Sequence, residues 1–132
     1  MAQTIEGIPH LDSWELNEIL QDPASPVIVI DVREPEEYQA AHIPGLPLIP
    51  MGDMIDAVDQ LDKSKPYVFV CRSGRRSLEV AKYFMSNGLR DVHNHLGGML
   101  NWQEEGLPVA STAEVPAFRL DQLERKGSHE HD

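Results

Sequence analysis

Short apolar runs alternate with amphipathic segments along the first hundred residues. Residues 27–30 (Val-Ile-Val-Ile) and 67–70 (Tyr-Val-Phe-Val) are continuous apolar runs rich in β-branched and aromatic side chains. Runs of this kind are typical of strands that are buried on both faces of a parallel sheet. A weaker apolar run at residues 92–96 predicts one more strand.

Helices are predicted between these strands. Residues 11–20 carry apolar side chains at helical spacing, and Asp12 with Glu15 forms a capping-box pattern at their start. Pro35 follows Glu34 as in the first turn of a second helix. Apolar residues also recur every three or four positions in 54–61 and 75–87, which predicts two further amphipathic helices.

This alternation predicts an α/β fold, in which helices cover both faces of a parallel sheet. We expect residues 5–110 to form this domain. The pattern changes beyond it: residues 111–126 are expected to be a C-terminal extension with one short helix, and residues 127–132 a disordered tail. The extension suits either a cover on the domain or a dimer contact, so both a monomer and a homodimer remain open.

Composition limits the location and the partners. The 132 residues are 41% hydrophobic and carry a formal charge of −11, which suits one globular domain and disfavours nucleic acid or an anionic membrane as a partner. No stretch is long and apolar enough to span a bilayer. Residues 1–6 lack the basic start and apolar core of a signal peptide, so we expect a cytoplasmic protein.

The chain has one cysteine, Cys71. It can form neither an intramolecular disulfide nor a zinc site of the paired-cysteine kind. His93 and His95 share a strand face but have no third ligand, so we expect no metal site. A covalent intermediate on Cys71 would have to be discharged by an outside molecule.

Cys71 stands where a predicted strand gives way to a predicted helix. A loop in this position directs backbone N–H groups and the positive end of the helix dipole at its first residue, which favours a thiolate and a bound anion. Gly74 suits a backbone conformation with positive φ. We take Cys71 as the catalytic candidate and the following loop as the substrate-binding candidate: Arg72, Ser73, Gly74, Arg75 and Arg76.

Four segments together resemble the single-domain rhodaneses in order and spacing. They are residues 31–38 (DVREPEEY), 42–45 (HIPG), 71–77 (CRSGRRS) and 97–102 (GGMLNW), the last followed by GLPV at 106–109. The resemblance covers roughly residues 5–110 and implies a rhodanese-like fold, with a five-stranded parallel sheet flanked by helices on both faces. One departure is Ala41, where the family usually has glycine.

The resemblance implies a thiosulfate sulfurtransferase without a cofactor. Cys71 would attack the outer sulfur of a small anionic donor such as thiosulfate and hold that sulfur as a persulfide. Cyanide or a thiol would then accept it, which divides the transfer into two steps. Backbone N–H groups of residues 72–76 would stabilise the terminal sulfur.

Two alternatives remain. One is a sulfur-relay module that is loaded by a protein partner and hands the sulfur on. The other is a Cys-loop phosphatase or an arsenate reductase, whose signature places five residues between the cysteine and an arginine. Here that position is Ser77, and Arg76 comes after four residues, so the loop length favours sulfur chemistry.

Overall fold

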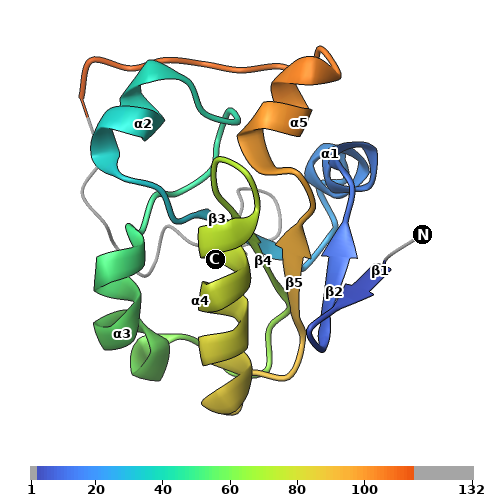
Figure 1. Ribbon diagram of the computed structural model, residues 1–132, viewed down its shortest axis with the longest axis vertical. Helices are drawn as coiled ribbons and strands as arrows, with labels where there is room; N and C mark the ends of the chain where they lie inside the picture. The colour runs from blue at the N-terminus through green and yellow to red at the C-terminus, as the bar shows by residue number, and fades with distance from the viewer. Residues whose placement is uncertain (1–2, 115–132) are drawn as a thin grey trace.

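The computed structural model describes residues 3–114, which form a five-stranded sheet between helices (Figure 1). The strand order across the sheet is β1-β2-β5-β4-β3. The strands are β1 (Gln3–Ile5), β2 (Ile8–Leu11), β3 (Ile28–Asp31), β4 (Tyr67–Val70) and β5 (Val92–His95). The predicted α/β class is therefore confirmed.

The sheet is mixed, so the expectation of a purely parallel sheet was wrong. β2, β5, β4 and β3 run parallel, but β1 pairs antiparallel with β2. Glu6 and Gly7 join the two strands with φ values of 53° and 83°, and positive φ at both positions is typical of a type I′ two-residue hairpin turn. The sequence analysis missed this hairpin because Glu-Gly lacks the Asn or Asp that usually marks such a turn.

The four predicted helices form, with one exception in length, and a fifth forms near the end of the described chain. The helices are α1 (Ser13–Gln21), α2 (Pro35–Ala40), α3 (Met54–Ala57), α4 (Arg75–Ser86) and α5 (Gly98–Glu104). The capping box of α1 is present, with Asp12 and Glu15 each accepting the other's backbone N–H. Only one α-helical turn forms in the segment 54–61, between the 3₁₀ helices η1 (Met51–Asp53) and η2 (Val58–Gln60).

Two hydrophobic cores lie on opposite faces of the sheet. Alternate side chains of β4 enter alternate cores: Tyr67 and Phe69 pack in one, and Val68 and Val70 in the other. The first core contains residues of α3 and α4, and the second contains residues of α1 and α5. The helices therefore hold β4 from both sides, which fixes the point where it ends.

The carboxyl ends of the four parallel strands meet at one edge of the sheet, where α/β proteins bind their ligands. At the end of β3, Asp31 and Arg33 form a buried ion pair with an Nη2–Oδ2 distance of 2.8 Å. β4 lies between β3 and β5 and ends directly before Cys71. The edge therefore presents the cysteine loop at its centre.

The end of the described chain returns to α2. Ala110 forms a bridge with His42, and the Thr112 N–H donates to the Gln39 carbonyl at 3.1 Å; Figure 1 shows this segment passing over α2. From residue 115 onward, the predicted C-terminal helix and tail lie outside the described residues. Within residues 3–114, no helix is long and apolar enough to cross a membrane.

Candidate active site

The sulfur of Cys71 lies at the start of α4 and accepts three hydrogen bonds. The Gly74 N–H donates at 3.1 Å, the Ser77 N–H at 3.4 Å and the Ser77 hydroxyl at 3.3 Å. Only 1% of Cys71 is exposed. Each of these donors is placed to stabilise negative charge that develops on the sulfur.

The sulfur takes the place of a helix cap. Gly74 is the N-cap residue of α4 with φ 95° and ψ 0°, and it has no side chain to accept from the first amides. Ser77 is the third residue of the helix, whose N–H an N-cap side chain normally satisfies. Here Cys71 accepts it instead, so the positive end of the helix dipole acts on the sulfur. The expectation of positive φ at Gly74 is confirmed.

Ser77 is a site residue that the sequence analysis missed. Its side chain is fully buried, and both of its donors reach Cys71. The resemblance used Ser77 only as the end of the motif. Counting helical positions from Gly74 would have found it, because the third residue of a helix directs its N–H back toward the cap.

The first turn of α5 packs directly on the cysteine loop. The Met99 N–H donates to the Cys71 carbonyl at 2.9 Å, and the Leu100 N–H donates to the Arg72 carbonyl at 3.0 Å. A Cβ atom on Gly98 would lie 2.5 Å from both of these carbonyl oxygens. Only glycine therefore fits at this close approach of two backbone segments.

The three loop arginines have different environments. Arg76 makes a two-pronged ion pair with Glu37 of α2, with both N–O distances 2.8 Å. The guanidinium of Arg76 lowers the pKa of Glu37 to about 2, so the pair stays charged. Arg72 and Arg75 are exposed, and neither has an ion-pair partner within residues 3–114. Arg76 fastens the loop to α2, whereas the other two remain available to an anion.

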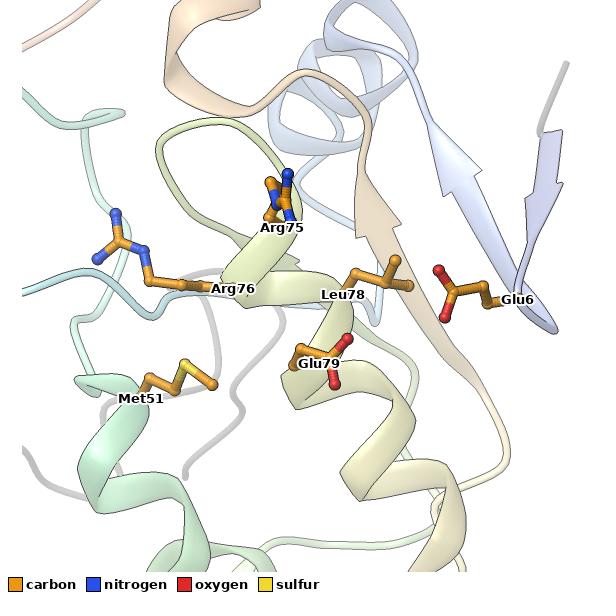
Figure 2. A pocket seen from close by; sticks show the side chains of 6 residues that line it. All are labelled: Glu6, Met51, Arg75, Arg76, Leu78 and Glu79. Carbon is orange, nitrogen blue, oxygen red and sulfur yellow. The ribbon is translucent and has the colours of Figure 1, made fainter.

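A hollow of about 410 Å³ lies beside the first turn of α4. Figure 2 shows Arg75 and Arg76 extending in different directions from this turn, with Glu79 one helical turn further on. The lining residues are Glu6, Met51, Arg75, Arg76, Leu78 and Glu79. Cys71 is not among the lining residues. The hollow is therefore a surface depression with charged walls beside the loop, and the Cys71 sulfur does not line it.

The described histidines do not form a metal centre, because no group of three or more metal-ligating side chains occurs within residues 3–114. His95 instead lies in the core on the α1 side, with its Nε2 2.8 Å from the Ser13 hydroxyl. That hydroxyl donates its only proton to Asn101, so His95 must donate from Nε2. Burial lowers the pKa of His95 to about 4, which keeps the ring neutral.

We expect His95 to make the fold sensitive to acid. The unfolded chain takes up this proton near pH 6.5, whereas the native chain resists it until about pH 4. The free energy of unfolding should therefore be constant above pH 6.5. It should fall by about 3 kcal/mol in total between pH 6.5 and about pH 4. Urea unfolding of His95→Gln across this range should show a shallower pH slope than the native chain. An equal pH slope for His95→Gln and the native chain would contradict the assignment.

The chain is similar to known proteins over most of its length. Residues 14–105 match the family model described as Rhodanese-like domain. YtwF of Bacillus subtilis is 48% identical over 80 residues, which are 61% of this chain and 77% of that protein. The thiosulfate sulfurtransferase GlpE of Coxiella burnetii (strain RSA 331) is 28% identical over 96 residues, which are 73% of this chain and 85% of GlpE.

The comparison with a solved structure points to the same family as these relatives. The rhodanese-like domain protein from Staphylococcus aureus superposes with a TM-score of 0.67 at 37% identity, and the match covers 77% of this chain and 98% of that one. The resemblance inferred from the four sequence motifs is thereby confirmed. This chain, with its α/β sheet and its cysteine loop at the start of α4, belongs to the rhodanese-like domain family.

Proposed function

We propose that the protein is a thiosulfate sulfurtransferase that carries sulfane sulfur as a persulfide on Cys71. The observation that carries the proposal is the set of three hydrogen bonds to the Cys71 sulfur at the start of α4. The name of GlpE supports the choice of thiosulfate as the donor. No cofactor takes part in this scheme.

The reaction proceeds in two nucleophilic steps. The Cys71 thiolate attacks the outer sulfur of thiosulfate, the sulfur–sulfur bond of the donor breaks, and sulfite leaves with the electron pair. A thiolate or cyanide then attacks the outer sulfur of the persulfide, and the Cys71 thiolate is the leaving group. No net redox partner is needed, and each half can be observed separately.

The loop amides supply the electrostatic part of the mechanism. Arg75 and Arg76 are the first two residues of α4, so their N–H groups have no intrahelical acceptor and point out of the helix start. With the N–H groups of Arg72 and Ser73 they would surround the terminal sulfur of the persulfide. A donor of this kind contributes about 3 kcal/mol of transition-state stabilisation.

In this proposal, the positive charges of Arg72 and Arg75 attract and bind the anionic sulfur donor. We expect Arg72→Ala and Arg75→Ala each to raise the thiosulfate KM by about 2- to 5-fold, as an exposed charge contributes about 1 kcal/mol or less. Added salt screens these charges, so both increases in KM should be smaller at high ionic strength. Steady-state kinetics at low and high salt measure them.

Arg90→Ala is the matched control for these variants. Arg90 is exposed and lies just before the amino end of β5, at the opposite edge of the sheet from Cys71. The Arg90→Ala substitution removes one positive charge, as the two loop variants do, but at a position far from the loop. It should therefore leave the thiosulfate KM unchanged. Equal KM values for Arg72→Ala, Arg75→Ala and Arg90→Ala would show that the loop arginines do not bind the donor.

A sulfur-relay module is the second candidate. Leu100 is 47% exposed although its N–H bonds to the loop at Arg72, so an apolar side chain lies beside the active-site loop where a protein partner could contact it. Kinetics with thiosulfate and cyanide separate the two functions. An enzyme gives parallel double-reciprocal lines and saturates with thiosulfate; a relay module turns over poorly and loads from a protein persulfide.

A further inference from the structure

Three carbonyl groups of the cysteine loop are tied to the segment that runs from β5 into α5. The Cys71 and Arg72 carbonyls accept the backbone N–H groups of Met99 and Leu100. The Gly74 carbonyl accepts a hydrogen bond from the Asn94 side chain, Nδ2 to O, at 2.8 Å. Of the three ties, only the last is made by a side chain and can be removed by substitution.

These ties orient the N–H groups of the loop. In a planar trans peptide the C=O and the following N–H point in opposite directions. A carbonyl held against β5 or α5 therefore turns the next N–H away from that side. The three tied peptides bear the N–H groups of Arg72, Ser73 and Arg75, which are three of the four donors that the proposed mechanism assigns to the persulfide.

The Asn94 amide is fixed in one orientation. Its Nδ2 lies 2.8 Å from the Gly74 oxygen and 3.1 Å from His10 Nε2, so both of its N–H bonds have acceptors. Its Oδ1 is buried and has no hydrogen-bond partner among the residues that the structure describes. Turning the amide over would place this oxygen against the Gly74 carbonyl oxygen, and two acceptors repel.

His10 determines the second contact. It is a buried side chain on β2, and its Nδ1 lies 2.9 Å from the Ile8 carbonyl. Nδ1 must therefore carry the hydrogen, which leaves the Nε2 lone pair to accept from Asn94. Hydrogen bonds thus connect β2 to Asn94 and Asn94 to Gly74, and the Gly74 N–H donates to the Cys71 sulfur.

We infer that Asn94, oriented by His10, is a positioning residue that holds Gly74 so that the loop amides face the reacting sulfur. The hydrogen bonds to the Cys71 sulfur within residues 3–114 come from Gly74 and Ser77, so both Asn94 and His10 act at one remove from it. The packing agrees with this role: a Cβ atom on Gly74 would lie 3.2 Å from the His95 carbonyl oxygen and 3.3 Å from the Gly97 nitrogen. Gly74 is therefore held against β5, and its carbonyl accepts both the Asn94 side chain and, at 3.3 Å, the Leu78 N–H of α4. The inference rests on the proposed function only in that Cys71 is the nucleophile.

Asn94→Leu tests the inference because leucine is similar in size and has no N–H donor. We expect the variant to lower kcat with thiosulfate about 10- to 100-fold, the effect of slight misplacement of a reacting group. The thiosulfate KM should change by less than about twofold, because Arg72 and Arg75 are untouched. The thiolate absorbance of Cys71, recorded in the ultraviolet over a series of pH values, should fall at the same time.

Two further variants test the part played by His10. His10→Gln keeps an acceptor for Asn94 and should retain most of the native kcat and thiolate absorbance. His10→Leu removes the acceptor and should resemble Asn94→Leu. Equal behaviour of the two His10 variants would overturn the assigned orientation of Asn94.

Val92→Ala is the control for a general loss of stability. Val92 lies on the same strand, packs in the core that contains Cys71, and makes no side-chain hydrogen bond. It should lower the melting temperature yet keep the native thiolate absorbance. An Asn94→Leu variant with native thiolate absorbance would overturn the inference. Because this absorbance needs no sulfur donor, it tests the positioning role even if thiosulfate turnover fails.

Discussion

Cys71→Ser should abolish sulfur transfer, with a loss of roughly a thousandfold or more in kcat. A serine hydroxyl is a far weaker nucleophile than a thiolate and cannot form a persulfide. The native hydrogen bonds from Gly74 and Ser77 stabilise charge on sulfur, and a neutral hydroxyl carries no such charge. The cyanide assay with thiosulfate measures this loss directly.

The fold should survive this substitution. Serine is slightly smaller than cysteine and still offers an acceptor to the start of α4, so thermal unfolding should shift by only a few degrees. Arg90→Ala, far from the loop, sets the native reference for activity. A folded Cys71→Ser variant that keeps a substantial share of the native kcat would contradict a covalent role for Cys71.

Gly98→Ala should damage both stability and catalysis. A Cβ atom at this position would lie 2.5 Å from the carbonyl oxygens of Cys71 and Arg72, and φ at Gly98 is 59°. Neither oxygen can retreat as a flexible side chain would, because both belong to the loop backbone. We expect about 2–4 kcal/mol of lost stability, from overpacking together with backbone strain, and a kcat about 100-fold lower because the loop is displaced.

Gly106→Ala separates these two causes. Gly106 also has positive φ, at 75°, but nothing lies within 4 Å of an added Cβ. This control should show only the backbone strain, about 1 kcal/mol, with native kcat. Urea unfolding and the cyanide assay on both variants provide the comparison. Equal kcat values would show that the approach of Gly98 to the loop does not position Cys71.

The local parts of the site could be predicted from the sequence. The run 67–70, the cysteine after it and the periodic segment 75–87 are neighbours along the chain, so the strand, loop and helix follow from local patterns. Gly74 belongs to the same stretch, and its positive φ could be predicted for that reason. The β1–β2 hairpin escaped prediction because a non-glycine residue, Glu6, adopts positive φ.

The contacts that support the loop could not be predicted in this way. Glu37 reaches Arg76 across 39 positions, and Asn94 reaches Gly74 across 20. No local periodicity relates such pairs, because the strand order of the sheet brings them together. The five loop residues were therefore grouped as substrate-binding from the sequence, whereas the structure distinguishes Arg76, which is paired with Glu37, from the exposed Arg72 and Arg75.

Intact mass spectrometry before and after incubation with thiosulfate, followed by cyanide, tests the central claim most directly. The persulfide account predicts a gain of one sulfur atom that maps to Cys71, is absent from Cys71→Ser and is removed by cyanide. A native chain that keeps a bare Cys71 thiol after thiosulfate would contradict the account.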